Sequence, residues 1–229
     1  MSALYRLQNL DYSYEWNKQK VPVLKTLNIE FNEACFCCIV GPSGSGKTTL
    51  LNLLGLLDSP TNGQIIFGGQ DVGNLPESQK EEIRLHKVGF VFQSFYLIPT
   101  LTILENTSYF LPSLGYSADD AKKTALETLD LLGIANHAHK KPLELSGGQR
   151  QRAAIARAIA KKPSVVLADE PTANLDSETA EKIIGAFKEL QKSQRTSFIF
   201  STHDSHLVKY AETIHHIKDG QISKGASAT

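Results

Sequence analysis

The 229-residue chain has no excess of either charge. Lysine and arginine together number 24, and aspartate and glutamate also number 24. A protein that binds nucleic acid or an anionic membrane surface normally carries a cluster of basic residues. We therefore expect no nucleic acid among the partners of this chain.

Long apolar runs are also missing. No stretch approaches the roughly 18 consecutive apolar residues that a membrane-spanning helix needs, and residues 1–10 lack the apolar core of a secretory signal. We expect the chain itself to be soluble and to stay on the cytoplasmic side. Apolar residues make up 41% of the chain, which is enough for one α/β core and a small subdomain.

Cysteine is scarce. The three cysteines, Cys35, Cys37 and Cys38, lie within four positions. In an extended strand Cys35 and Cys37 point to one face and Cys38 to the other, so a disulfide or a tetrahedral metal site would be awkward. We predict three small buried apolar side chains in a reducing compartment.

The residues after these cysteines match a phosphate-binding loop. An apolar run (residues 35–40) precedes the loop and a helix-like run (residues 50–57) follows it. The loop residues are Gly41, Pro42, Ser43, Gly44, Ser45, Gly46, Lys47, Thr48 and Thr49. In this setting backbone N–H groups and a helix N-terminus surround phosphate oxygens. Lys47 would contact the β- and γ-phosphates, and the Thr48 hydroxyl would bind Mg²⁺.

The periodicity of apolar residues predicts strands at both ends of the chain and helices between them. Residues 4–14 and 23–31 should pair as antiparallel strands joined by a loop at 15–20. Further elements are expected as strands at 64–67, 88–92, 164–168 and 196–200, helices at 77–87 and 177–193 (capped by Ser177), a hairpin at 214–223 and a frayed end at 225–229.

From residue 93 to residue 157 the pattern becomes mainly helical. Helices are expected at residues 119–132 and from residue 147 onward, and an apolar patch at residues 95–99 lies outside any core strand. We interpret this stretch as a helical subdomain inserted into the core. The whole chain, 1–229, would then be one domain, with its core at about 1–92 and 158–229.

A second glycine-containing motif opens the helix at residue 147. Ser146 is placed as the helix N-cap, followed by Gly147, Gly148 and Gln149. Small residues at a helix start are what a second phosphate-contacting surface needs, although a glycine-rich helix start also explains them.

Polar side chains follow two predicted strands. Asp169 and Glu170 come after the strand at 164–168, where ligand sites of α/β sheets form. Asp169 would hold Mg²⁺ through a water and Glu170 would polarise the attacking water, the alternative being a solvated acidic turn. His203 follows the strand at 196–200 and could donate to a γ-phosphate oxygen or position the water. The other histidines considered, His137, His139, His206, His215 and His216, have no comparable setting and are expected to be surface or packing residues.

Tyr12, Tyr14 and Trp16 end the first strand. Tyr14 could stack on a nucleobase, and core packing is the alternative.

Together these motifs resemble the nucleotide-binding subunit of an ABC transporter. In family order they are Tyr14, the phosphate loop, Gln93, the signature at 145–149, Asp169 with Glu170, the Asn-Leu-Asp run at 174–176, and His203. Kinases and GTPases share the phosphate loop but lack the signature. The resemblance implies a P-loop NTPase core with an antiparallel β subdomain and an inserted helical subdomain, which hydrolyses ATP with Mg²⁺.

Finer features are similar to the lipoprotein-release and macrolide-efflux group, whose membrane partners transmit force. These features are the run around Gln93 and the run at 101–106. One departure is Ala34 with Cys35, where the family usually has Gly-Glu, which puts the geometry of that turn in question.

The resemblance also implies partners. Ser146 and Gly148 would contact the γ-phosphate bound to Lys47 of a second copy, with Asp176 across the same interface. Gln93 would link the γ-phosphate and Mg²⁺ to the patch at 95–99, where a short helix of a transmembrane permease subunit would land. The chain would thus lie peripherally at the cytoplasmic face of the inner membrane.

Three functions follow, in order of preference. The first is the ATPase of an exporter. The second is the ATPase of a non-transporting complex that regulates a cell-envelope enzyme, as in cell division. The third is a soluble ABC ATPase of DNA repair or translation, which usually carries insertions or a second ATPase unit that this chain lacks.

Overall fold

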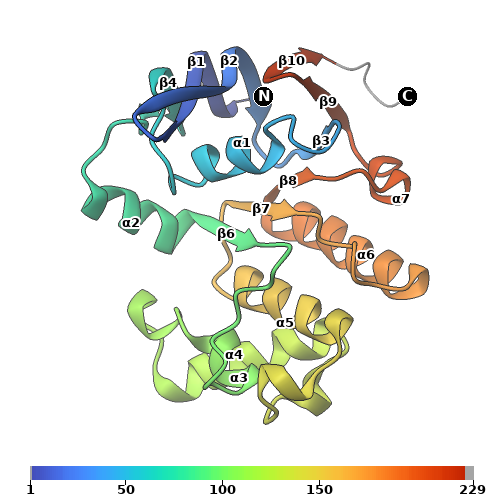
Figure 1. Ribbon diagram of the computed structural model, residues 1–229. Coiled ribbons are helices and arrows are strands. Elements are labelled where there is room, and N and C mark those ends of the chain that lie inside the picture. The colour runs from blue at the N-terminus through green and yellow to red at the C-terminus, as the bar shows by residue number, and fades with distance from the viewer. Residues whose placement is uncertain (1, 225–229) are drawn as a thin grey trace.

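Two sheets and a group of helices make up the computed structural model, which describes residues 2–224. One sheet has the strand order β2-β1-β4-β5 and the other β10-β9-β3-β8-β7-β6. Helices α3, α4 and α5 lie together on the far side of the second sheet from the first (Figure 1). The expected frayed end at 225–229 lies outside the described residues.

The first sheet is antiparallel, as the alternation of apolar residues predicts. It comprises β1 (Ala3–Trp16), β2 (Gln19–Asn32), β4 (Asn62–Phe67) and β5 (Gln70–Asp71). The expected loop at 15–20 is shorter than predicted, because the strands continue to Trp16 and restart at Gln19. Only Asn17 and Lys18 form the turn, both with positive φ, as a tight two-residue hairpin requires.

The second sheet has a parallel centre. Its strands are β3 (Phe36–Val40), β6 (Val88–Val91), β7 (Val165–Asp169), β8 (Ser197–Ser201), β9 (Thr213–Lys218) and β10 (Gln221–Lys224). Parallel pairing runs from β6 through β7, β8 and β3 to β9, and β10 pairs antiparallel with β9. The carboxyl ends of the parallel strands therefore meet at one edge, where loops from distant parts of the sequence converge.

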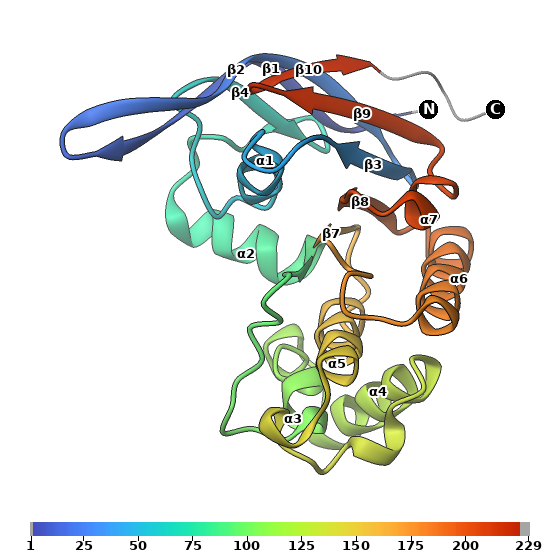
Figure 2. The same ribbon diagram turned by 45° about the vertical axis from the view of Figure 1, so that its right-hand side comes forward.

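Helices cover both faces of this sheet (Figure 2). The α-helices are α1 (Lys47–Leu54), α2 (Glu77–Lys87), α3 (Ile103–Ser108), α4 (Ala118–Leu131), α5 (Gly147–Ile159), α6 (Ser177–Gln194) and α7 (Ser205–Val208). Short 3₁₀ turns are η1 (Pro112–Leu114), η2 (Ala135–His137) and η3 (Pro142–Glu144). None of the helices in the described part of the chain is long and apolar enough to cross a membrane.

The helical insertion is present where the sequence predicts it. Helices α3, α4 and α5 pack on one another, and α5 also packs on β6. The boundaries at residues 93 and 157 stay a prediction, because α5 contacts both the other helices of the insertion and β6 of the core.

The cap of α6 differs from the prediction. Asp176, rather than Ser177, caps the helix, because its carboxylate accepts from the Thr179 backbone N–H at 3.0 Å. A carboxylate at this position stabilises the positive end of the helix dipole better than a hydroxyl does.

The cysteines behave as predicted. All three are buried and free. Cys35 and Cys37 belong to the core between the two sheets, and Cys38 belongs to the core between the second sheet and the helices. The strand's two faces thus serve two different cores.

The turn before β3 contains a strained residue. Ala34 has φ +53°, in the left-handed region that favours glycine. Its carbonyl oxygen accepts from Gln191 Nε2 at 2.6 Å, which ties the turn to α6. The departure from the usual glycine therefore leaves the turn in place but costs conformational energy.

Ala34→Gly should raise stability. Relief of the left-handed strain exceeds the added chain entropy of glycine, so we expect a gain of up to about 1 kcal/mol, or about 2–4 °C in Tm. Thermal and urea unfolding would measure it. Ala118→Gly, at an exposed position at the start of α4, is the control and should lower stability; equal effects of the two substitutions would contradict the assignment of strain.

Candidate nucleotide-binding and catalytic site

The phosphate loop connects the carboxyl end of β3 to α1. Gly44 and Gly46 have φ +76° and +102°, which glycine adopts at little cost. A Cβ atom at Gly41 would stand 2.1 Å from the Ile217 carbonyl oxygen, and one at Gly46 would stand 2.7 Å from Leu24 Cδ2. The loop therefore passes so close to its neighbours that only glycine fits.

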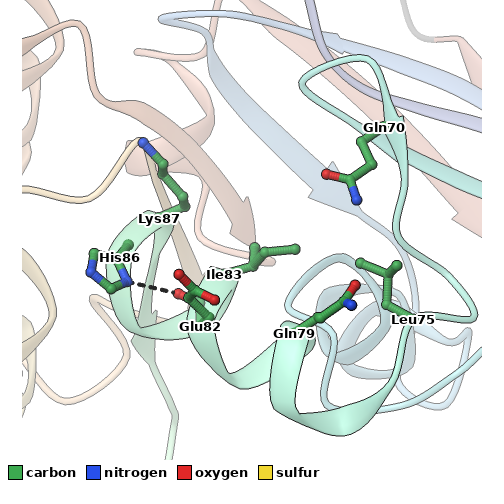
Figure 3. A pocket seen from close by; sticks show the side chains of 7 residues that line it. All are labelled: Gln70, Leu75, Gln79, Glu82, Ile83, His86 and Lys87. Carbon is green, nitrogen blue, oxygen red and sulfur yellow. Dashed lines mark hydrogen bonds between the residues drawn. The ribbon is translucent and has the colours of Figure 1, made fainter.

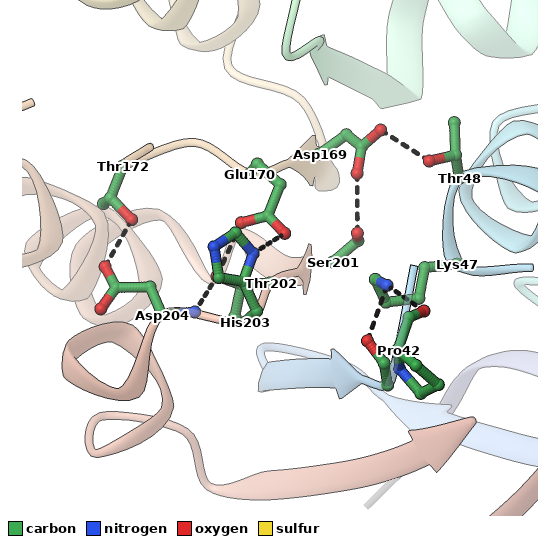
Figure 4. A network of polar contacts seen from close by, with 11 residues as sticks. Pro42, Lys47, Thr48, Asp169, Glu170, Thr172, Ser201, Thr202, His203 and Asp204 are labelled. Carbon is green, nitrogen blue, oxygen red and sulfur yellow. Dashed lines mark hydrogen bonds and ion pairs between the residues drawn. The ribbon is translucent and has the colours of Figure 1, made fainter. Parts of the chain in front are cut away.

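The polar groups of the loop fit phosphate. Lys47 Nζ donates to the carbonyl oxygens of Gly41 and Pro42 at 2.8 and 2.9 Å (Figure 4) and forms no ion pair within residues 2–224. Ser45 Oγ is buried and has no hydrogen-bond partner in this described part of the chain. No side chain caps the start of α1, where Gly46 is the N-cap. An ammonium, an unpaired hydroxyl and free helix N–H groups together suit an anion.

Asp169 joins the loop to the sheet. Its Oδ2 accepts from Thr48 Oγ1 at 2.8 Å and its Oδ1 accepts from Ser201 Oγ at 2.7 Å (Figure 4). Thr48 lies in the first turn of α1, and Asp169 and Ser201 end β7 and β8. Hydroxyl and carboxylate oxygens are the ligands that Mg²⁺ prefers, so this pair could hold that ion.

Glu170 and His203 are in direct contact. His203 Nδ1 lies 2.6 Å from Glu170 Oε1, and Thr202 Oγ1 donates to Glu170 Oε2 at 3.2 Å (Figure 4). Glu170 is buried, with φ +49°, whereas the His203 side chain is 79% exposed. A left-handed glutamate is costly, and this backbone aims the carboxylate at the histidine rather than along the strand. A solvated acidic turn does not describe it.

Two supporting residues were not among the sequence candidates. Ser201 holds Asp169, and Thr202 contacts Glu170 while accepting from the Asp204 backbone N–H at 2.9 Å. Ser201 ends the buried strand β8, and Thr202 follows it directly before His203. Their position at the same sheet edge as Asp169 was the signal that could have identified them.

Tyr14 and Gln93 lie at the rim of this edge. The Tyr14 ring is 44% exposed, its hydroxyl is 3.2 Å from Thr49 Oγ1, and Tyr12 packs against it. The ring is therefore accessible to a ligand, whereas Tyr12 takes the core position. Gln93 is exposed and follows β6, whose Val91 pairs with Ala168 next to Asp169. Strand register thus brings Gln93 to the sheet edge that carries Asp169.

The signature is not brought to the phosphate loop. Ser146 caps α5, and within residues 2–224 no hydrogen bond or ion pair joins residues 146–149 to the loop. The 13 residues of α5 span roughly 20 Å, and the chain enters β7 from the other end of that helix (Figure 2). A Cβ atom at Gly148 would stand 3.0 Å from the Asn174 carbonyl oxygen, so glycine lets that loop lie against the signature.

A separate hollow carries none of these residues. It has a volume of about 590 Å³ and lies between the β4–β5 turn and α2 (Figure 3). Its polar groups include Gln70, Gln79 and Glu82, and His86 Nδ1 is hydrogen-bonded to the Glu82 backbone oxygen at 3.0 Å. Its lining residues do not combine a cation with free backbone N–H groups of a glycine-rich loop, as the phosphate loop does.

Comparison with known proteins agrees with the motifs. The family described as ABC transporter matches residues 24–173. The chain is 40% identical to the ABC transporter ATP-binding protein MJ0796 of Methanocaldococcus jannaschii, over 96% of both chains. It is 40% identical to the lipoprotein-releasing system ATP-binding protein LolD of Hahella chejuensis, over 98% of this chain and 97% of that one. A macrolide export ATP-binding/permease protein, MacB of Syntrophobacter fumaroxidans, is 40% identical over 98% of this chain, which corresponds to 32% of that longer protein.

Solved structures confirm the predicted fold class. A dimeric post-hydrolysis structure of MJ0796 bound to ADP and Pi superposes with a TM-score of 0.94 at 39% identity, covering 98% of this chain and 99% of that one. The antiparallel sheet, the P-loop core and the helical subdomain are therefore those of this type of cassette, and the chain belongs to the ABC transporter family as an ATP-binding cassette that hydrolyses ATP.

Proposed function

We propose that this chain drives a separate membrane permease and works as a homodimer closed by ATP. The proposal rests on the separation, within one chain, of the phosphate loop from the signature. The phosphate loop, Asp169 and Glu170 share one sheet edge, whereas the signature lies at the distant end of α5. A second copy in head-to-tail orientation would supply the missing signature, and the dimeric form of MJ0796 supports this arrangement.

In this proposal each residue has a distinct role. Lys47 exchanges its bonds to loop carbonyls for the β- and γ-phosphates, and Tyr14 stacks on the base. Thr48, Asp169 and Gln93 would hold Mg²⁺, which would supply positive charge to offset that of the phosphates. Across the dimer, Ser146 and Gly148 contact the γ-phosphate, and Asp176 lies in the same interface.

Hydrolysis then requires one proton acceptor. Water attacks the γ-phosphorus as the bond to the β–γ bridging oxygen breaks, and Glu170 accepts the water proton. Thr202 and His203 hold the Glu170 carboxylate beforehand. His203 is largely exposed, so it can turn to donate to a γ-phosphate oxygen when the second copy covers the site.

A groove beside the catalytic edge suits the permease. It has a volume of about 600 Å³, and its apolar lining consists mainly of Phe90, Phe92, Tyr96, Tyr109 and Phe110. Of the patch at 95–99, only Tyr96 lines it, so most of the aromatic lining lies outside the stretch expected from sequence.

The groove also contains cations from α5 and the residues after it. Arg157 donates to the carbonyl oxygens of Phe95 and Tyr96, so it holds the backbone next to Gln93. Lys161 Nζ donates to the Arg84 carbonyl oxygen at 2.7 Å, and burial and the Arg157 cation lower its pKa to about 8. We propose that a short cytoplasmic helix of the permease docks here, which would place the chain peripherally on the cytoplasmic face of the inner membrane.

The similarity to LolD and MacB supports an exporter of the lipoprotein-release or macrolide-efflux type. A reconstituted complex should then move cargo across vesicles at the expense of ATP. ATP hydrolysis with no flux of any cargo class would favour the non-transporting regulatory complex instead.

Glu170→Gln should bind ATP normally but lose at least about 100-fold in kcat, because the amide cannot accept the proton. The variant should also accumulate as an ATP-bound dimer. Phosphate release and sedimentation would measure the two effects. Glu181→Gln, at an exposed position on α6, is the matched control and should behave like the parent; near-parental turnover of Glu170→Gln would exclude Glu170 as the base.

Lys47→Ala should weaken nucleotide binding by about 10- to 100-fold, because a charged hydrogen-bond donor is lost from the phosphates. Titration with a fluorescent ATP analogue would measure the affinity. Lys192→Ala, on the exposed surface of α6, should leave it unchanged. Equal affinity of Lys47→Ala and the parent would show that the loop does not hold phosphate through this residue.

Tyr96→Arg should abolish capture of a polytopic membrane protein while basal ATPase activity persists, because the added cation enters a groove that is already lined by three, Arg84, Arg157 and Lys161. The measurement is co-purification after detergent extraction of the native membrane. Tyr210→Arg, at an exposed tyrosine outside the groove, is the control. If no polytopic protein accompanies even the parent, the proposal of a permease partner is wrong.

A further inference from the structure

The signature is held in shape by a reciprocal pair of hydrogen bonds. The Ser146 backbone N–H donates to Gln149 Oε1 at 2.9 Å, and the Gln149 backbone N–H donates to Ser146 Oγ at 3.3 Å. This capping box sets the direction of the first turn of α5. The orientation of the Gln149 amide is thereby decided, because only its oxygen can accept from the Ser146 N–H.

The other end of this amide contacts a histidine. Gln149 Nε2 lies 3.0 Å from His137 Nε2. An amide nitrogen can only donate, so His137 Nε2 must accept. The imidazole is therefore neutral, with its proton on Nδ1. A protonated ring would direct an N–H group at the amide NH₂, and the contact would become repulsive.

The surroundings of His137 favour the neutral ring. His137 ends η2, and its Nδ1 is buried and has no hydrogen-bond partner among the described residues, 2–224. The charged groups that face it are two cations, Lys140 from the following loop and Arg152 from α5, and together with burial they lower the pKa of His137. Arg152 is held in place because it donates to the carbonyl oxygens of Leu132 and Gly133 after α4.

We propose that His137 is a positioning residue for the signature: by accepting from Gln149 it fixes the Ser146 cap, so ATP-driven pairing of two chains weakens as acid protonates the ring. The inference rests on the proposed function, because the signature acts there on nucleotide held by the other copy. The sign follows from the chemistry. The hydrogen bond is intact while the ring is neutral, at and above the pH of about 6.5 where histidine ordinarily titrates. It is lost as the pH falls below that value.

Two substitutions separate the hydrogen bond from packing. In His137→Gln the amide oxygen replaces Nε2 as an acceptor that does not titrate, and in His137→Phe a ring remains without an acceptor. His139→Gln is the control, because His139 is exposed two residues away. All are made in the Glu170→Gln background, so that dimers persist for measurement.

The readout is ATP-driven dimerisation by sedimentation from about pH 5.5 to pH 8. We expect the His137→Gln dimer to match the parent at neutral pH and to lose less affinity in acid. The His137→Phe dimer should be about three- to tenfold weaker for each of its two signature helices at neutral pH, with a similarly flat profile. Because His203 is present in every variant, the difference between profiles isolates His137. The His139→Gln profile should follow the parent.

A second measurement does not depend on pairing. Imidazole ¹⁵N–¹H spectra of the nucleotide-free chain, assigned by the signal lost in His137→Gln, should show a neutral ring with hydrogen on Nδ1. A proton on Nε2 at neutral pH overturns the inference, as do dimers of both variants that keep the parental profile. If Glu170→Gln forms no dimer with ATP at all, the proposed function fails, whereas variant dimers that form and match the parent refute this inference alone.

Discussion

The hydrogen bonds of Asp169 to Thr48 and Ser201 are the contacts on which the rest of the site depends. They connect the first turn of α1 to the ends of two neighbouring strands, so the phosphate loop cannot shift without moving the sheet edge. The next residue, Glu170, inherits its position from this anchor. Its backbone N–H donates to the Ser201 carbonyl oxygen at 2.9 Å, which places its carboxylate against Thr202 and His203. The proposed ion site and the proposed base are therefore positioned by one local arrangement of hydrogen bonds.

Backbone strain is present at this edge and beside the groove, as it is at several turns elsewhere in the chain. Glu170, Phe95 and Tyr96 all have positive φ. Such conformations cost of order 1–3 kcal/mol each and persist only where the surroundings impose them. Here Arg157 holds the carbonyl oxygens of Phe95 and Tyr96, and the strands behind Glu170 rest on a buried cluster of Phe187, Phe198 and Phe200 with ring centroids 4.9–5.9 Å apart. The packing of this aromatic core offsets the conformational energy of the strained residues.

Helix α5 joins the surfaces that lie outside the catalytic edge. The capping box of the signature forms one end, and Arg157, near the other end, holds the backbone that follows β6. The buried residues in the middle of α5 are mainly its own alanines and isoleucines, so we expect the helix to move as one rigid body. A change at the signature and a change at the groove are thus displacements of the same rigid element.

The sequence by itself determined the phosphate loop, the signature cap, the strand-end carboxylates and the longer strands and helices, because these follow from local periodicity and from what glycine and capping residues do to the backbone nearest them. The short elements α3, α7 and β5 were not predicted. The sequence also correctly placed Cys35 and Cys37 on one side of the sheet and Cys38 on the other, although Cys35 lies just before β3. Only the tertiary structure decided that Ser201 supports Asp169, that His137 meets Gln149, and that aromatic side chains from both sides of residues 95–99 line one groove. Such contacts join residues far apart in the chain, and they depend on strand register and on the rotation of one helix against another, which no local pattern encodes.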